Sequence, residues 1–251
     1  MNRFLLLSVG AVSLAVGLRA ADAAALVREA LAAEARLDSQ AALQFLQQAD
    51  AARPDDAFIL QKIARQYSDL VLAQPGTEAK QRYARTALAY AQRAVARAPD
   101  DPVSVLSLAV CHGKLALYSD ASTKVQYSRL VREEAERALA LNPDYAWAHH
   151  VLGRWHCEVA SLGVTEKFFV RLFYGGLPGA SPAEAVRHLQ RAVELEPAEL
   201  NHWLELGFAC AAAGQRAEAR SHWAHGLTLP ERGKHDAAAK ERARAALARL
   251  D

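Results

Sequence analysis

Cysteine is scarce in this sequence, and the three that occur lie far apart: Cys111, Cys157 and Cys210. An exported domain that depends on disulfides has an even number of cysteines at close spacing, so this pattern excludes a disulfide framework. All three fall in apolar stretches, and we expect them to be small buried side chains. Pairing of two of them after export is the alternative.

Motifs that carry catalysis are missing as well. The sequence contains no phosphate-binding loop, no nucleophile elbow and no paired-carboxylate motif. Zinc-binding patterns such as His-Glu-x-x-His and Cys-x-x-Cys are also lacking. We therefore predict that the chain is not an enzyme and needs no cofactor.

The chain has no net charge when its N-terminal residues 1–20 are left out of the count. The chain has 30 Lys plus Arg and 28 Asp plus Glu, and residues 1–20 hold Arg3 and Arg19 but no acid. Without them, 30 minus 2 leaves 28 basic residues, which equals the number of acidic ones. A neutral chain gives no electrostatic reason to expect a nucleic acid as ligand.

Apart from its start, the chain has no long hydrophobic run. Arg3 precedes an apolar run from Phe4 to Leu18, and small residues follow around Ala20. This order is typical of a secretory signal peptide, and the run is shorter than the roughly 18 to 20 residues that span a bilayer. We expect residues 1–20 to be removed on export, to the periplasm or outside the cell. An uncleaved N-terminal anchor is the alternative.

Turn-forming and β-branched residues are sparse, whereas alanine and leucine dominate a sequence that is 52% apolar. Such a composition favours helices. Five prolines, each after an Ala- and Leu-rich run, stand 45, 44, 54 and 33 residues apart: Pro54, Pro99, Pro143, Pro197 and Pro230. An alanine lies five residues before each of the first four. The chain therefore consists of repeats.

A large apolar residue followed by a small one recurs at the same distance after the first four of these prolines. The pairs are Ile63–Ala64, Leu108–Ala109, Leu152–Gly153 and Leu206–Gly207. Two helices approach to about 8 to 10 Å only where one of them presents almost no side chain. The pattern predicts an all-α fold. It resembles the tetratricopeptide repeat, and this resemblance implies a right-handed α-solenoid of helix-turn-helix units.

The pattern also predicts the division of the chain. We expect a signal peptide at 1–20, repeats at 21–230 and a charged C-terminal capping helix at 231–251. Helices are predicted at 22–36, 39–52, 56–74, 78–98, 102–119, 123–141, 144–162, 181–196, 198–213, 215–228 and 235–250. An aromatic-rich insertion at 163–180 is predicted to form a short amphipathic helix that covers the core; a partner- or membrane-facing patch is the alternative.

Several segments together are more distinctive than a generic repeat. In order, they are Lys124-Val-Gln-Tyr-Ser, Glu134-Ala-Glu-Arg-Ala-Leu-Ala-Leu-Asn-Pro, His150-Val-Leu-Gly-Arg-Trp and Phe168-Phe-Val-Arg-Leu-Phe-Tyr followed by Gly-Gly-Leu-Pro. Between about residues 100 and 230 this order resembles the regulator of microtubule dynamics family. The resemblance implies a scaffold or adaptor that binds a protein, in the named members microtubules or organelle-contact partners. Because an exported chain would not meet tubulin, we carry over the fold and the binding role.

Helical spacing also predicts a binding groove. The face opposite the small packing residues should point into the concave side of the solenoid, where basic, polar and aromatic groups can grip a peptide. A solvated face without a ligand is the alternative. The predicted groove residues are Gln61, Arg65, Lys114, Trp147, His150, Arg154, Glu158, Asn201, Leu204 and Phe208.

The histidines are the one feature of the sequence that suggests a metal-binding site. His149, His150, His156 and Cys157 share a predicted helix, and Cys111 with His112 precede them, but adjacent helical residues diverge by about 100°. His112, His149 and His156 fall on repeat packing positions, so we expect buried packing histidines and no metal site.

We therefore predict an exported scaffold that binds a protein or peptide partner. A self-assembling envelope component is the second hypothesis, and its homo-oligomers would appear in a concentration series. A metal-dependent enzyme using the histidine and cysteine cluster is the third.

Overall fold

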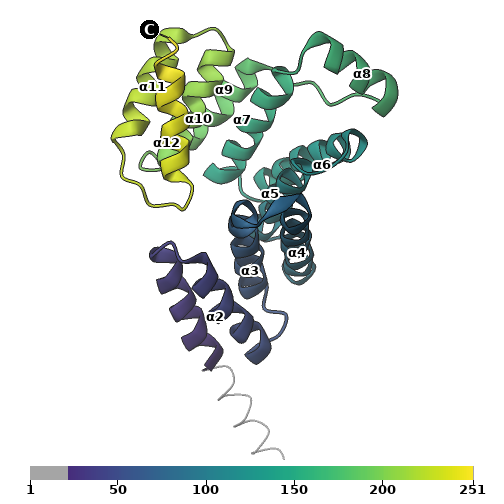
Figure 1. Cartoon of the computed structure of the whole chain (residues 1–251), viewed down its shortest axis with the longest axis vertical. Helices are drawn as coiled ribbons and strands as arrows, with labels where there is room; N and C mark the ends of the chain where they lie inside the picture. The colour runs from purple at the N-terminus through teal and green to yellow at the C-terminus, as the bar shows by residue number, and fades with distance from the viewer. Residues whose placement is uncertain (1–21, 251) are drawn as a thin grey trace, which may run out of the picture. The chain divides into compact units, whose positions relative to one another are not determined.

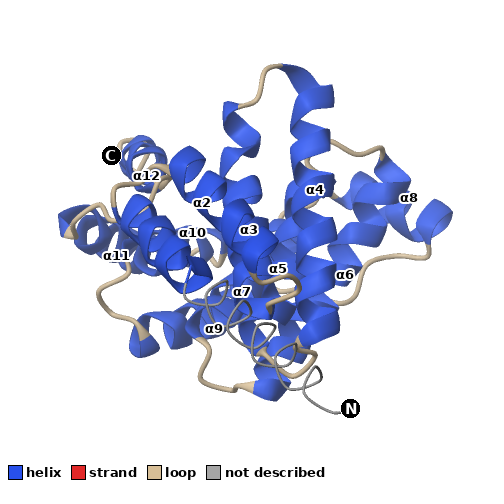
Figure 2. Cartoon of the chain, turned by 90° about the horizontal axis from the view of Figure 1, so that it is seen from below, coloured by secondary structure: helices blue, strands red, loops and turns tan. Residues whose placement is uncertain are grey.

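The computed structural model describes residues 22–250, and this part of the chain is made of helices joined by turns and loops, without a strand (Figure 2). The prediction of an all-α fold is confirmed. Residues 22–35 are helical, and the later elements are α2 (Ser39–Ala52), α3 (Ala57–Leu70) with the short 3-10 helix η1 (Val71–Ala73), α4 (Gly76–Arg97), α5 (Pro102–Ala116), α6 (Ala121–Leu141), α7 (Ala146–Ala160), α8 (Val164–Tyr174), α9 (Pro182–Leu195), α10 (Leu200–Ala212), α11 (Arg216–Thr228) and α12 (Asp236–Leu247).

Short polar side chains set the start of many of these helices. The carboxylate of Asp56 accepts a hydrogen bond from the backbone N–H of Ile59, and the Ser181 hydroxyl accepts one from Glu184. Such caps satisfy backbone donors that have no partner inside the helix. Proline at the first position, as in Pro102 of α5, loses nothing because its missing N–H would be unpaired there.

The chain divides into two compact units, with the boundary in the sequence between Pro99 and Asp100. In the first, helix 22–35, α2, α3 and α4 enclose a core that includes Leu46, Ile59 and Ile63, all fully buried. The ring of Tyr67 packs on two tyrosines of α4 at 5.4 and 5.9 Å between centroids.

The second unit contains α5 to α12 (Figure 1). Its hairpins are α5 with α6, α7 with α9, and α10 with α11; α6 packs on α7, and α10 packs on both α7 and α9. The α7–α9 pair is the predicted hairpin whose two helices are separated by the insertion.

The predicted small residues lie at these helix contacts. Ala64 and Ala109 are each 1% exposed, and Gly153 and Gly207 are buried. A Cβ atom on Gly207 would lie 2.4 Å from the indole of Trp223 in α11, and one on Gly153 would lie 2.5 Å from Leu189 in α9. Only hydrogen fits at these two positions, as the large-small pattern predicts.

The C-terminal helix α12 packs on α10 and α11. It is held by charges that are buried: Asp236 accepts backbone hydrogen bonds from Arg232 and Gly233, and Lys240 donates to the carbonyl of Leu229 at 2.5 Å. The first two turns of α12 are therefore fixed by hydrogen bonds as well as by apolar packing.

The predicted signal peptide lies outside the described residues. No helix within residues 22–250 is long and apolar enough to cross a bilayer.

Candidate binding surfaces

The residues of the predicted groove belong to both units. Gln61 and Arg65 are on α3 in the first unit, and Arg65 pairs with Asp69 one turn later at 3.9 Å. The other eight are on α5, α7 and α10 in the second unit.

Two predicted groove residues are buried, and their placement on an open face was wrong. His150 is 6% exposed and Leu204 is fully buried. Each repeat helix packs on its hairpin partner and also on the next hairpin, so spacing from the small residue identifies only one of two covered faces. His150 meets His202 of α10, with 2.9 Å between their Nδ1 atoms, and Leu204 fills the space beside Gly226 of α11.

Three more predicted groove residues are engaged within the fold. The Trp147 ring lies 5.0 and 4.8 Å from the imidazoles of His150 and His202. Phe208 packs on Trp223, and the Arg242 guanidinium lies over its ring. The Asn201 amide donates to Asp236 at 2.8 Å and so ties α10 to the start of α12. These side chains shape the second unit from within.

Arg154 and Glu158 remain on the surface, with 43% and 69% of their side chains exposed. They form an ion pair with each other at 2.8 Å. Glu205 of α10 lies 3.7 Å from Arg154 and also pairs with Arg242 of α12. The cations of this face already have carboxylate partners, so a peptide carboxylate would have to compete with Glu205.

The insertion differs most from its prediction. It forms the predicted helix, α8, but no residue of α8 is buried, so the expectation that it covers the core is wrong. Val170 and Tyr174 of α8 are half-buried, but five other large apolar side chains are 50% to 87% exposed. We call this set the α8 apolar surface: Val164, Phe168, Phe169, Leu172 and Phe173.

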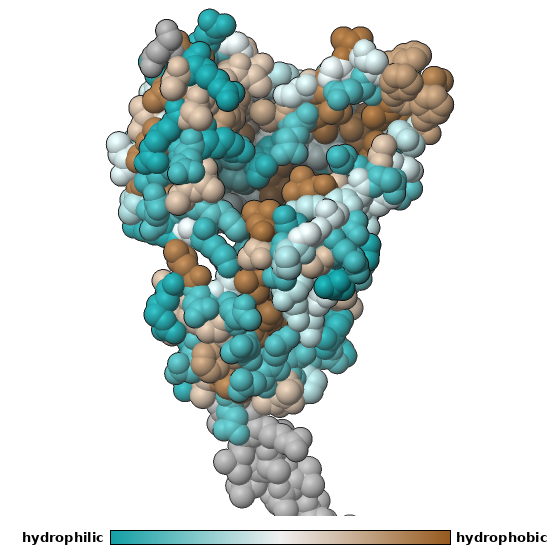
Figure 3. Space-filling view, in the orientation of Figure 1, coloured by the Kyte–Doolittle hydropathy of each residue, from teal (hydrophilic) through white to brown (hydrophobic). Residues whose placement is uncertain are grey.

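Helical spacing places these five side chains on one broad face of α8, since Phe168 and Leu172, and likewise Phe169 and Phe173, are four residues apart. Phe169 stacks on Phe173 with 5.8 Å between ring centroids, and Phe168 meets Phe169 edge-on. In the space-filling view, apolar side chains gather over α8 (Figure 3). Exposed contiguous apolar surface is unusual on soluble proteins and marks interaction sites.

Polar contacts hold α8 in place at both ends. Glu166 accepts the Gly163 N–H at the start, and Lys167 donates to the carbonyl of Ala160 at 2.8 Å. At the other end, Gly175 adopts a left-handed φ of 73°, which terminates the helix. The Arg129 side chain of α6 donates to the carbonyls of Tyr174 and Gly176. The helix is thus anchored through its backbone while its apolar side chains stay exposed.

Histidines line both covered faces of α7. The adjacent His149 and His150 point to α9 and α10 respectively, and His149 Nδ1 lies 2.9 Å from His188 Nδ1. Burial lowers the pKa of His188 and of His202 to about 4. The prediction that His112, His149 and His156 are buried is confirmed.

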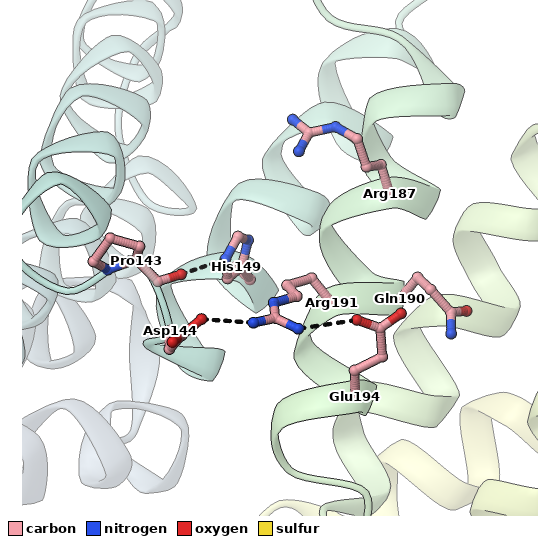
Figure 4. A pocket seen from close by; sticks show the side chains of 7 residues that line it. All are labelled: Pro143, Asp144, His149, Arg187, Gln190, Arg191 and Glu194. Atoms are coloured by element: carbon pink, nitrogen blue, oxygen red, sulfur yellow. Dashed lines mark hydrogen bonds and ion pairs between the residues drawn. The ribbon is translucent and has the colours of Figure 1, made fainter.

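A hollow opens beside His149, between the start of α7 and the exposed side of α9 (Figure 4). Arg191 spans it, donating to Asp144 at 2.6 Å and to Glu194 at 3.2 Å, while His149 Nε2 bonds the carbonyl of Pro143 at 3.0 Å. Asp144, His149, Arg191 and Glu194 are therefore already engaged in hydrogen bonds within the fold, and a ligand would have to compete for them.

The cysteines are unpaired, and Cys111 and Cys210 are buried as predicted, while Cys157 is partly exposed. Burial raises the pKa of the Cys111 thiol to about 12, which keeps it protonated and unreactive.

Comparison with known proteins identifies the class to which this architecture belongs. A solved tetratricopeptide-repeat protein of Thermus thermophilus superposes with a TM-score of 0.66 at 21% identity, covering 90% of this chain and 99% of that one. The fold is therefore of the tetratricopeptide-like helical-repeat type.

The sequence narrows this class to one family. The family described as Regulator of microtubule dynamics protein 1-3 matches residues 26–251, and the chain belongs to it. The match includes the first repeat, so the resemblance is longer than the predicted 100–230.

Individual relatives are distant. Human Regulator of microtubule dynamics protein 2 is 27% identical over 59% of this chain, and Bos taurus Regulator of microtubule dynamics protein 1 is 27% identical over 57%. These alignments span 36% and 45% of the two relatives, so the chain covers less than half of their length.

Proposed function

We propose that this protein is an exported adaptor that binds a protein partner through the α8 apolar surface and acts without catalysis. The observation that carries the proposal is the exposure of Phe168, Phe169, Leu172 and Phe173 on a helix that the rest of the fold anchors but does not cover. A few buried residues carry most of the binding energy of a protein interface, and aromatic side chains, phenylalanine included, are enriched there. A helix that is already fixed also loses little entropy on binding.

Binding of a protein partner to the α8 apolar surface fits the structure better than binding of a peptide in the predicted groove. On the α7–α10 face, Arg154 and Glu205 are already paired and His150 is buried. The α8 side chains, in contrast, lose no intramolecular contact with the core when a partner covers them. Helical-repeat proteins commonly serve as scaffolds for other proteins.

The names of the relatives connect those proteins with microtubules. The N-terminal sequence supports export of this chain, so we propose a partner in the periplasm or outside the cell in place of tubulin. The mass of the mature chain, isolated from its source, tests export: loss of about the first 20 residues is expected, and an intact N-terminus argues against cleavage.

Cross-linking in the native compartment tests the surface. The double variant Phe169→Ser with Phe173→Ser should lose the partner that the unmodified chain captures. Leu117→Ser is the matched control, because Leu117 is 63% exposed but lies outside α8. Capture that persists in the double variant, or is lost equally in the control, would exclude the α8 apolar surface.

The same samples test the other hypotheses. Loss of the partner only on charge reversal of Arg65, Lys114 and Arg154 would favour the predicted groove. An increase in mass with concentration that the double variant abolishes would favour self-assembly through α8, and co-sedimentation with vesicles would favour a membrane surface.

A further inference from the structure

Two histidines and a glutamate converge where α9 begins to pack on α7. His156, Glu184 and His188 each offer a ligand atom, and these atoms all lie within 4.8 Å of one another. Glu184 and His188 are four residues apart on α9 and therefore share a face, and His156 faces them from α7. None of the metal-binding combinations suggested by the sequence contains Glu184 or His188.

Close packing fixes the backbone around this triad. Gly153 lies one turn before His156, and a Cβ there would meet Leu189 at 2.5 Å and the carbonyl of Ala185 at 3.2 Å. Ala185 and Leu189 are fully buried and flank the ligand positions on α9. The two helices that carry the triad are therefore held close together without a ligand.

A chain of hydrogen bonds determines which ring nitrogen of His188 carries the lone pair. The Pro143 carbonyl can only accept, so the proton of neutral His149 is on Nε2, 3.0 Å from that oxygen. His149 Nδ1 then accepts from His188 Nδ1–H at 2.9 Å, which leaves the lone pair on His188 Nε2. Histidines that bind metals are commonly oriented by such a second partner on the other ring nitrogen.

A cation already lies between two of the ligand groups. The Arg187 guanidinium donates to Glu184 Oε2 at 2.6 Å and to His188 Nε2 at 3.0 Å. Its side chain is 61% exposed, so it can turn into water without breaking the core. A positive charge is thus stabilised at the point where the carboxylate and the imidazole lone pair meet.

We propose that His156, Glu184 and His188 bind a divalent transition metal, with Zn²⁺ as the best match, after Arg187 turns away. Two imidazoles and one carboxylate form a Zn²⁺ site that leaves a fourth position for water or a partner side chain. Zn–N and Zn–O bonds of about 2.0 to 2.2 Å place ligand atoms roughly 3.4 Å apart, so the triad must contract slightly. The Glu184 side chain, 45% exposed, has room for that movement.

The site would fasten the segment that leads from α8. Ser181, the N-cap of α9, donates its backbone N–H toward His156 Nδ1 at 3.4 Å, so the ligands lie at the end of the insertion. This long contact has to open when His156 binds the metal, because the single lone pair of the neutral imidazole cannot serve both. Zn²⁺ would link α7 to α9 at this point and limit the opening of the hairpin that carries α8.

Titration of the full chain with Zn²⁺ after chelator treatment tests the proposal. Calorimetry should report one Zn²⁺ per chain, and Co²⁺ in its place should give the visible absorption of a tetrahedral nitrogen and oxygen site. His156→Gln and Glu184→Gln should abolish both signals, and His149→Gln should weaken affinity about 10- to 100-fold. Glu194→Gln, on the same helix but outside the triad, is the matched control.

Arg187→Gln gives a readout that no merely structural role predicts. Removing the competing guanidinium should raise Zn²⁺ affinity by up to about fivefold. Circular dichroism checks that each variant is folded, and the partly exposed Glu184 keeps the test valid even if His156→Gln unfolds. No binding by the unmodified chain, full binding by Glu184→Gln, or weaker binding by Arg187→Gln would overturn the proposal.

Discussion

At the scale of single residues, the second unit depends on positions where a side chain is absent. Gly207 and Gly153 let α11 and α9 approach until Trp223 and Leu189 touch the opposite backbone. The sequence predicts these positions because a small residue after a large one recurs in every repeat. It does not predict which side chain fills the space, since Trp223 is sixteen residues away and on another helix.

We predict that Gly207→Ala destabilises the protein although alanine favours helices. The new Cβ would lie 2.4 Å from the Trp223 ring, and overpacking of this kind costs about 1 to 3 kcal/mol. Gly113→Ala in α5 is the matched control, because its Cβ would meet Val131 at an ordinary 3.8 Å. There the gain in helix propensity, up to about 1 kcal/mol, should dominate. Urea unfolding of both variants should give opposite signs, and equal signs would contradict the packing account.

The buried pair of His150 and His202 predicts acid sensitivity. Burial lowers the pKa of His202 from 6.5 to about 4, and Trp147 and Glu196 are its other close neighbours. Because the folded state favours neutral His202, the contribution of this histidine to the free energy of unfolding is fully present above pH 6.5. It is lost progressively as the pH falls from 6.5 towards 4. The shift corresponds to roughly 3 kcal/mol.

His202→Asn retains a polar atom near Nδ1 but does not titrate. The difference between the free energies of unfolding at pH 7.5 and pH 5 should therefore shrink in this variant. An unchanged difference, measured by urea unfolding at both values, would assign the acid sensitivity to other groups.

At the scale of elements, the helices and their pairing follow from the sequence, but the exposure of individual faces does not. The predicted 181–196 and the observed Pro182–Leu195 agree closely, because the Ser-Pro start and the proline after the end are local signals. Leu204 and His150 were misplaced because periodicity shows that a face is apolar or polar without showing which neighbour covers it.

The insertion illustrates the same limit. Its aromatic spacing predicts an amphipathic helix, which α8 is, yet the apolar stripe faces away from the core. The contacts that decide this, from Arg129 to backbone carbonyls 45 and 47 residues away, leave no local signal in the sequence. The sequence gives no reason to select Arg129 over another arginine as the residue that contacts the end of α8.

We predict that Arg129→Gln loosens α8 without unfolding the rest of the unit. The side chain supplies several hydrogen bonds to the end of α8, whereas α8 buries no side chain in the core. Amide hydrogen exchange should increase over residues 163–180 and stay unchanged in α9. Arg82→Gln, which removes an exposed ion pair in α4, should change neither. Unchanged exchange in α8 would show that other contacts hold it.

At the scale of the whole molecule, each of the two units has a core of its own. The first is built around Leu46, Ile59 and Ile63, and the second around Leu189, Leu204 and Leu206, all fully buried. The sequence predicts one continuous repeat domain over 21–230, because its repeats are alike and carry no sign of a boundary at Pro99.

We expect residues 100–251 to fold when expressed alone. The hairpins of the second unit pack on one another, and α12 covers its last hairpin, so its core is complete. Circular dichroism should show high helicity and urea should unfold the fragment in one cooperative transition. A fragment that lacks a cooperative transition would mean that the units depend on each other.

In the α7–α9 hairpin, the two helices pack on each other through Gly153 with Leu189 and through His149 with His188, and residues 163–180 make neither contact. Because this connection takes no part in the packing of α7 on α9, its length and sequence can vary. With the function proposed above, replacing residues 163–180 by another sequence would change the partner that binds and leave the repeats intact.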